Sequence, residues 1–101
     1  MKEKISNFVE ELYDVLTKIE TKEDAKALLA DLCTYKEIEQ MAQRIKAAEL
    51  LLEGKTYSQV IVTTDISSAT LSRVSRCIQH GSGGYRKFVD YKILESKNNK
   101  L

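Results

Sequence analysis

Residues 56–79 combine small hydroxyl side chains with two arginines, the side-chain types that can contact base edges and phosphates. Leu71, Val74 and Ile78 lie within this stretch at positions i, i+3 and i+7 of a helical repeat. This spacing predicts one buried stripe along a helix. The hydroxyl side chains and the arginines fall mainly off the stripe, so we expect them on a surface that can approach a polar, charged partner.

The same stretch predicts a short helix, a tight turn and a second helix. Thr56 or the pair Tyr57-Ser58 can open the first helix with a capping hydroxyl, and Ser67 or Ser68 can cap the second. Between them, Asp65 tolerates the left-handed backbone conformation that a tight turn needs. This layout is that of a helix-turn-helix over residues 56–79, in which the second helix enters the major groove of double-stranded DNA.

The residues of this motif divide by the role we expect for them. Five should face base edges: Ser67, Ser68, Ala69, Thr70 and Ser72. Four should set the register on phosphates or reach bases: Ser58, Gln59, Arg73 and Arg76. We predict that Arg76→Ala weakens binding to all DNA sequences alike and flattens the salt dependence, whereas Thr70→Ala alters the sequence preference.

A helical protein-interaction adaptor is the alternative function that the same residues allow. Any helical hairpin in a bundle can have a Ser-capped second helix, and its arginines can simply be solvated. Asp65 occupies the turn position where Gly is commonest, and Ile61 is bulky where the two helices should pass closely. The net charge of +1 also favours an adaptor. Salt-dependent binding to random duplex DNA would discriminate, because an adaptor should show none.

Charge is distributed unevenly along the 101 residues. Residues 1–53 hold 8 Lys/Arg and 12 Asp/Glu, a net charge of −4, whereas residues 54–101 hold 8 and 3, a net charge of +5. The positive half contains the helical hairpin, as electrostatic attraction to phosphates would require. Part of the positive excess can equally belong to the lysines of the tail, Lys97 and Lys100.

The remainder of the chain also predicts helices, since it has no Pro and three of its four Gly lie in one loop at 81–84. Residues 2–19 form a dense apolar pattern with the helical period, which predicts a long amphipathic helix. Its apolar face is wide for so small a protein. We expect this face to be buried either against a second subunit or in a broad internal contact.

Capping residues predict where two further helices begin. Thr21 is followed three residues later by Asp24, and Thr34 is followed at the same spacing by Glu37, which makes a capping box. The helix that Thr34 opens should run to about Glu53 and form the central pillar of the fold. A last short helix should follow the glycine loop, which brings the expected total to about six helices.

We therefore predict one all-α domain over residues 1–95 and a frayed tail over residues 96–101. We expect no enzyme, no metal site and no cofactor, because His80 is the only histidine and has no placed Cys, Ser or carboxylate partner. Cys33 and Cys77 fit small buried hydrophobes in a reducing cytosol. The absence of a signal peptide or a long apolar run predicts a cytoplasmic protein with no membrane partner.

Five sequence blocks within residues 8–92 resemble the trp repressor superfamily, and most closely its YerC/YecD group of trp-repressor-related proteins. The blocks are Leu32–Glu37, Arg44–Gly54, Tyr57–Gln59, Ser68–Cys77 and Gly81–Tyr85. The resemblance implies an intertwined homodimer in which helices of both chains build one core and two helix-turn-helix units project from it. It also implies a transcriptional regulator, a repressor, on a two-fold related operator with half-sites about one DNA turn apart.

The resemblance also implies an effector pocket. Thr34, Arg44 and Arg73 match positions that line the tryptophan pocket of the trp repressor, where one arginine holds the ligand carboxylate and the other stacks on the indole. This chain departs from the repressor at Val74, where the repressor has Gly, and at Asp31, where it has Leu. Val74 should crowd an indole out and Asp31 should repel a carboxylate. We therefore expect a smaller or different effector, or none, rather than tryptophan.

Overall fold

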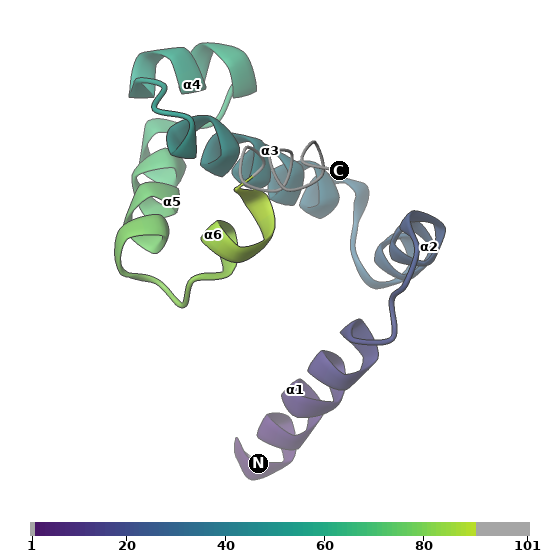
Figure 1. Cartoon of the computed structure of the whole chain (residues 1–101). Helices are drawn as coiled ribbons and strands as arrows, with labels where there is room; N and C mark the ends of the chain where they lie inside the picture. The colour runs from purple at the N-terminus through teal and green to yellow at the C-terminus, as the bar shows by residue number, and fades with distance from the viewer. Residues whose placement is uncertain (1, 91–101) are drawn as a thin grey trace, which may run out of the picture. The chain divides into compact units, whose positions relative to one another are not determined.

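The computed structural model describes residues 2–90, which form six α-helices and no strand (Figure 1). The helices are α1 (Lys2–Leu16), α2 (Lys22–Leu32), α3 (Tyr35–Leu52), α4 (Tyr57–Thr64), α5 (Ser68–His80) and α6 (Gly84–Val89). The predicted all-α fold of about six helices is confirmed. The frayed tail expected over residues 96–101 lies outside the described residues. None of the helices between residues 2 and 90 combines the length and the apolar character that a membrane span needs.

The chain divides into two compact units, Met1–Ile38 and Glu39–Leu101. The first unit holds α1, α2 and the first turn of α3, and the second holds the remainder of α3 with α4, α5 and α6. The helix-turn-helix motif therefore belongs to the second unit alone. The single domain expected over residues 1–95 stays a prediction.

The helix starts in the first unit follow the predicted caps. Thr21 precedes α2, and its hydroxyl accepts a hydrogen bond from the Asp24 N–H over 3.0 Å. Thr34 and Glu37 form a reciprocal capping box at α3: the Thr34 N–H donates to Glu37 Oε1 over 2.8 Å, and the Glu37 N–H donates to Thr34 Oγ1 over 3.1 Å. These bonds satisfy backbone N–H groups that a helix start leaves without partners.

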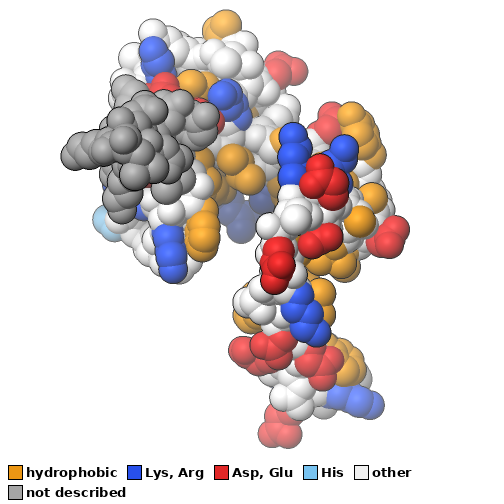
Figure 2. All heavy atoms as spheres, turned by 45° about the vertical axis from the view of Figure 1, so that its right-hand side comes forward, with side chains coloured by type: hydrophobic (Ala, Val, Ile, Leu, Met, Phe, Trp, Pro, Cys, Tyr) orange, Lys and Arg blue, Asp and Glu red, His pale blue; other side chains and the backbone are white. Residues whose placement is uncertain are grey.

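The apolar face of helix α1 is exposed to solvent. No side chain of α1 is buried, and its large apolar residues are exposed by fractions from 38% for Leu12 to 58% for Ile5. Figure 2 shows hydrophobic side chains of this helix, the lowest segment in the view, lying at the surface beside acidic ones. Within the described residues of the first unit, no element covers this face. The expectation of a second subunit is taken up below.

The core of the second unit lies where α3, α4 and α5 meet. It comprises six buried apolar residues: Ala47, Ala48, Val60, Ile66, Leu71 and Val74. The alanines on α3 are small, so the backbones of neighbouring helices can approach closely. Complete burial of a Val or Leu side chain stabilises the fold by roughly 1.5–3 kcal/mol each. The core therefore fixes α4 and α5 on α3 and leaves their outer surfaces free.

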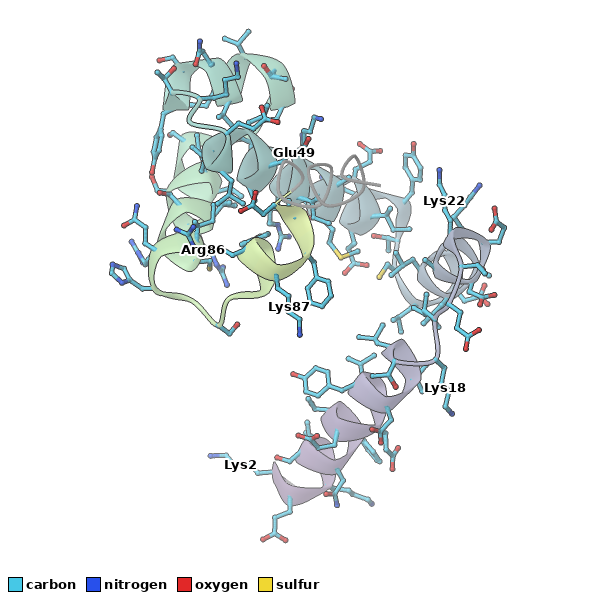
Figure 3. The ribbon with its side chains drawn as sticks, in the orientation of Figure 1. Lys2, Lys18, Lys22, Glu49, Arg86 and Lys87 are labelled. Atoms are coloured by element: carbon cyan, nitrogen blue, oxygen red, sulfur yellow. The ribbon has the colours of Figure 1, made fainter. Side chains whose placement is uncertain are left out.

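The glycine loop joins α5 to α6 through a close backbone approach. A Cβ atom at Gly81 would collide with the backbone carbonyl of Cys77, and Gly83 has a φ of 87°, which favours glycine. Arg86, on α6, points towards α5 (Figure 3), where its Nε donates to the Ile78 carbonyl over 3.2 Å. This bond holds α6 against the end of α5.

Candidate nucleic-acid interface

Helix α4 begins with a complete capping box. The Gln59 N–H donates to Thr56 Oγ1 over 3.2 Å, and the Thr56 N–H donates to Gln59 Oε1 over 2.9 Å. Of the two openings considered from the sequence, Thr56 is therefore the cap. The side-chain oxygen Oε1 of Gln59 accepts the bond from Thr56, so the side-chain NH₂ of Gln59 remains free for another partner. The neighbouring Ser58 is exposed.

The turn between α4 and α5 has the geometry that a helix-turn-helix needs. Asp65 adopts the left-handed conformation, with φ 60° and ψ 21°, and its N–H donates to the Ile61 carbonyl over 2.9 Å. The Ile61 side chain is half-buried and packs against the core. The two departures from the usual motif, Asp65 and Ile61, are thus both accommodated, so neither of them disrupts the turn.

Helix α5 separates apolar from polar side chains as its sequence predicts. Leu71 and Val74 are buried, and Ile78 is half-buried, so the predicted stripe faces the core. The polar residues of α5 lie off this stripe. Eight of the nine residues expected to contact DNA are exposed: Ser58, Gln59, Ser67, Ser68, Ala69, Ser72, Arg73 and Arg76. The ninth, Thr70, is half-buried.

Ser67 rather than Ser68 caps α5. Its Oγ accepts a hydrogen bond from the Thr70 N–H over 3.2 Å and lies within hydrogen-bond distance of Thr70 Oγ1, at 2.9 Å. Ser67 and Thr70 were both expected to face base edges. Two contacts join them to each other at the start of the helix, and both residues also line the cavity described below. Their contact with base edges stays a prediction.

The two arginines expected to contact DNA have no acidic partner in the described part of the chain. Between residues 2 and 90, the only ion pair joins Lys46 Nζ to Glu49 Oε2 over 3.4 Å, on α3. Arg73 and Arg76 are exposed and carry their charge into solvent. An arginine without a carboxylate neighbour can form charge-assisted hydrogen bonds to a phosphate without first breaking an ion pair.

A cavity of about 510 Å³ opens beside α5 in the second unit. Three residues of the expected effector pocket line it: Arg44, Arg73 and Val74. The fourth, Thr34, belongs to the first unit, where its hydroxyl and N–H form the capping box of α3. Among the residues that the structure describes, no acidic side chain lines the cavity and two arginines do, so its charge suits an anion.

The expected effector pocket left out Gln40, Gln43, Ile66 and Tyr85, which line this cavity. Ser67 and Thr70, expected to face base edges, line it as well. The spacing of Gln40 from Arg44 is i, i+4, which puts both on one side of α3 and could have indicated Gln40. The prediction of two buried cysteines is wrong. Cys33 is half-buried, and Cys77 is exposed because it faces the cavity rather than the core.

Comparison with known proteins agrees with this geometry. A family model described as Trp repressor protein matches residues 7–93, so the chain belongs to the Trp repressor family. The Uncharacterized protein YerC of Bacillus subtilis (strain 168) is 35% identical over 82 residues, which cover 81% of this chain and 79% of that relative. The predicted resemblance to a YerC-like, trp-repressor-related protein is therefore confirmed.

Two solved structures have the same fold. One is a crystal structure of a candidate Trp repressor from Staphylococcus aureus, with a TM-score of 0.79 and 32% identity, covering 85% of this chain and 86% of that one. The other is a TrpR like protein from Eubacterium eligens ATCC 27750, with a TM-score of 0.77 and 33% identity, covering 80% and 84%. The family is one of helix-turn-helix DNA-binding regulators rather than enzymes, and α4 and α5 supply that motif here.

Proposed function

We propose that this protein is a sequence-specific transcriptional repressor that binds, as a homodimer, a two-fold related operator in double-stranded DNA. The observation that carries the proposal is the division of α5 into a buried apolar side and an exposed polar side. Leu71 and Val74 hold the helix on the core, while Ser68, Ser72 and Arg73 are exposed. A helix anchored in this way can enter the major groove without losing its packing.

The residues of the interface suit two kinds of DNA contact. Small side chains at the start of α5, among them Ser68, Ala69 and Ser72, let the helix approach base edges closely. Arg73 and Arg76 lie further along the same helix and suit phosphates, as do Ser58 and the NH₂ group of Gln59.

The open apolar face of α1 supports the homodimer. Its side chains, such as Phe8 at 56% exposure, form a stripe that is costly to leave in water. In a dimer with two-fold symmetry, the commonest symmetry of soluble oligomers, the apolar stripe of one copy would pack against the same stripe of the second copy. A dimer of this kind would present two α5 helices to half-sites about one DNA turn apart.

Selection of genomic fragments by the purified protein, at near-physiological salt, tests the proposal. We expect enrichment of a two-fold symmetric motif, and we expect the variant Arg73→Ala/Arg76→Ala to lose that enrichment. Matched variants of two exposed cations on another helix, Lys22→Ala/Lys26→Ala, should keep it. If the protein shows no salt-dependent binding to any duplex, the adaptor function replaces the repressor function.

We also propose that the cavity binds a small anionic effector, smaller than tryptophan or of a different shape. The arginines Arg44 and Arg73, which line the cavity, would hold its charge. We expect the branched side chain of Val74 to crowd an indole ring. Thermal unfolding with a series of small carboxylic and amino acids tests this. A ligand should raise the melting temperature of the parent protein and not of Arg44→Ala, whereas tryptophan should have no effect. A shift by tryptophan would contradict the proposal.

A further inference from the structure

The cavity beside α5 shares part of its lining with the residues expected to contact DNA. Ser67, Thr70 and Arg73 line the cavity, and all three belong to the predicted DNA-contacting residues. We propose that a small divalent anion bound in this cavity weakens DNA binding, so that the effector releases the operator instead of strengthening repression. This inference rests on the proposed function, because it requires both a DNA-binding α5 and an anion in the cavity.

Arg73 is the residue that both ligands would need. Along α5 it follows Thr70 by three residues and precedes Cys77 by four, and all three residues line the cavity. It also follows Ala69 by four residues and precedes Arg76 by three, and these two exposed residues are not part of the cavity lining. Residues three or four apart lie on one side of a helix. Arg73 therefore lies at the border between the cavity side of α5 and the outer side that we expect to contact DNA.

The charge of the cavity suits a divalent anion. Arg44 of α3 and Arg73 of α5 line it, and no acidic side chain does so among the residues that the structure describes. The one ion pair found within residues 2–90, between Lys46 and Glu49, includes neither arginine. Both guanidinium groups can therefore donate to an oxyanion without first leaving a carboxylate. The cavity volume of about 510 Å³ is within the usual range for small-molecule sites.

The electrostatics of a shared arginine determine whether the anion weakens or strengthens DNA binding. A guanidinium group carries one positive charge, so two anions that share it repel each other and each is stabilised less than it would be alone. A divalent anion would also cancel the charges of the two arginines that line the cavity, and these charges attract DNA phosphates. The anion and DNA should therefore each weaken the binding of the other, by the same factor.

Succinate, a dicarboxylate, and inorganic phosphate are the two probes of this antagonism. Each replaces potassium chloride at constant ionic strength and neutral pH, so that the general screening of charges does not change. The dissociation constants for random duplex and for the operator from genomic selection are measured with and without the probe. At least one anion should raise both constants about tenfold at saturation, the scale of one hydrogen bond to a charged group. Succinamide, the uncharged diamide of succinate, should leave both constants unchanged.

Variants of individual cations assign the effect to the shared arginine. In Arg44→Ala, and in Arg44→Gln with its longer side chain, the anion should no longer change the dissociation constant for DNA. Arg73→Ala should weaken DNA binding and also abolish the effect of the anion. Arg76→Ala is the matched control on the same helix: it should weaken DNA binding but keep the effect, because Arg76 does not line the cavity. Lys22→Ala/Lys26→Ala, on α2, should alter neither quantity.

Calorimetric titration of the anion gives a second readout, which a general effect of salt would not produce. The effective probe is titrated into the free protein and into the protein saturated with random duplex. Its dissociation constant should be higher for the DNA complex, by the same factor that the anion causes in DNA binding. Equal affinity of the probe for the free protein and for the complex would overturn the antagonism.

The outcomes keep this inference distinct from the proposed function. If the parent protein binds DNA and neither anion weakens that binding, the antagonism is overturned and the DNA-binding function stands. An effect of the same size in Arg44→Ala, Arg44→Gln and the parent protein would place the anion outside the cavity and would overturn it too. If the parent protein shows no salt-dependent binding to any duplex, the repressor function fails and this inference fails with it.

Discussion

The side-chain amide of Gln43, on α3, donates to the backbone carbonyl of Thr64, at the end of α4, over 3.2 Å. The Thr64 hydroxyl in turn donates to the Val60 carbonyl and accepts from the Ile66 N–H over 3.3 Å. The turn that precedes α5 is therefore bound to the central helix as well as to α4. This bond joins residues 21 positions apart and helps to fix the angle at which α5 leaves the turn.

Gln43→Glu should destabilise the second unit by about 1–3 kcal/mol, because a carboxylate cannot donate to the Thr64 carbonyl and leaves it without its partner. Urea denaturation measures the change in the free energy of unfolding. Gln40→Glu is the control, since it introduces the same charge one turn earlier on an exposed part of α3. Equal losses in the two variants would show that the charge, rather than the hydrogen bond, is responsible.

Asp65 provides a test of the left-handed turn, since its φ is 60°. Asp65→Gly should raise the stability by up to about 1 kcal/mol, and Asp65→Ala should lower it by about 1 kcal/mol, because only glycine adopts this conformation without steric cost. Thermal unfolding gives both values. At Glu39, an exposed position within α3, the order should reverse, with Ala more stable than Gly. The same order at both positions would contradict the role given to the turn.

Arg76 is the residue we expect to contact a phosphate without reading the sequence. Arg76→Ala should weaken binding to the operator and to random duplex by the same factor and reduce the slope of log K against log salt by about 1. Titrations at several salt concentrations measure both quantities. Lys22→Ala removes an exposed cation from α2 instead and should leave the slope unchanged. An unaltered slope for Arg76→Ala would remove this residue from the interface.

Local features of the fold could be predicted because their causes are local. A cap such as Thr21 or Thr34 acts on N–H groups three residues away, so the sequence is enough to locate the helix start. The apolar stripe of α5 follows from spacing in the same way. The choice between Ser67 and Ser68 depends on which residue takes an extended conformation, and the sequence allows both.

Features that depend on distant residues could not be predicted. The exposure of Cys77 is set by the cavity that α3, α5 and α6 border, and a helical pattern records only that its neighbours are apolar. The bond from Gln43 to Thr64 likewise has no local signature. For α1 the sequence predicts an apolar face but carries no information about what covers it. The roles of the individual DNA-contacting residues stay predictions for the same reason.

The capping box at α3 predicts that the stability of the folded state depends on pH. Hydrogen bonding from the Thr34 backbone N–H, and to a smaller extent from the Thr34 side chain, favours the charged carboxylate and lowers the pKa of Glu37. Burial has a small opposing effect. A carboxyl group whose pKa is lower in the folded state stabilises that state above its unfolded pKa. This stabilisation should therefore be complete at neutral pH and disappear as the pH falls through the folded pKa.

The comparison of the parent protein with Glu37→Gln measures this effect. Gln can still accept from the Thr34 N–H but carries no charge, so the difference in melting temperature should be largest near pH 7 and shrink towards acid pH. Glu39→Gln is the control, because Glu39 is exposed on the same helix. A difference that does not change with pH would indicate that the charge of Glu37 adds nothing to the cap.

The open face of α1 yields the prediction that tests the homodimer. Phe8 and Leu12 lie at i, i+4 on this face, with exposed fractions of 56% and 38%. Phe8→Ser/Leu12→Ser should raise the dissociation constant of the dimer about a hundredfold or more, because each apolar side chain buried at a two-fold interface is lost twice. Glu10→Ser/Asp14→Ser changes the opposite side of the helix at the same spacing and should leave the dimer intact. Sedimentation equilibrium measures both variants, with circular dichroism to check that each remains helical. A parent protein that sediments as a monomer at all concentrations, or two variants that dissociate alike, would exclude this face as the subunit contact.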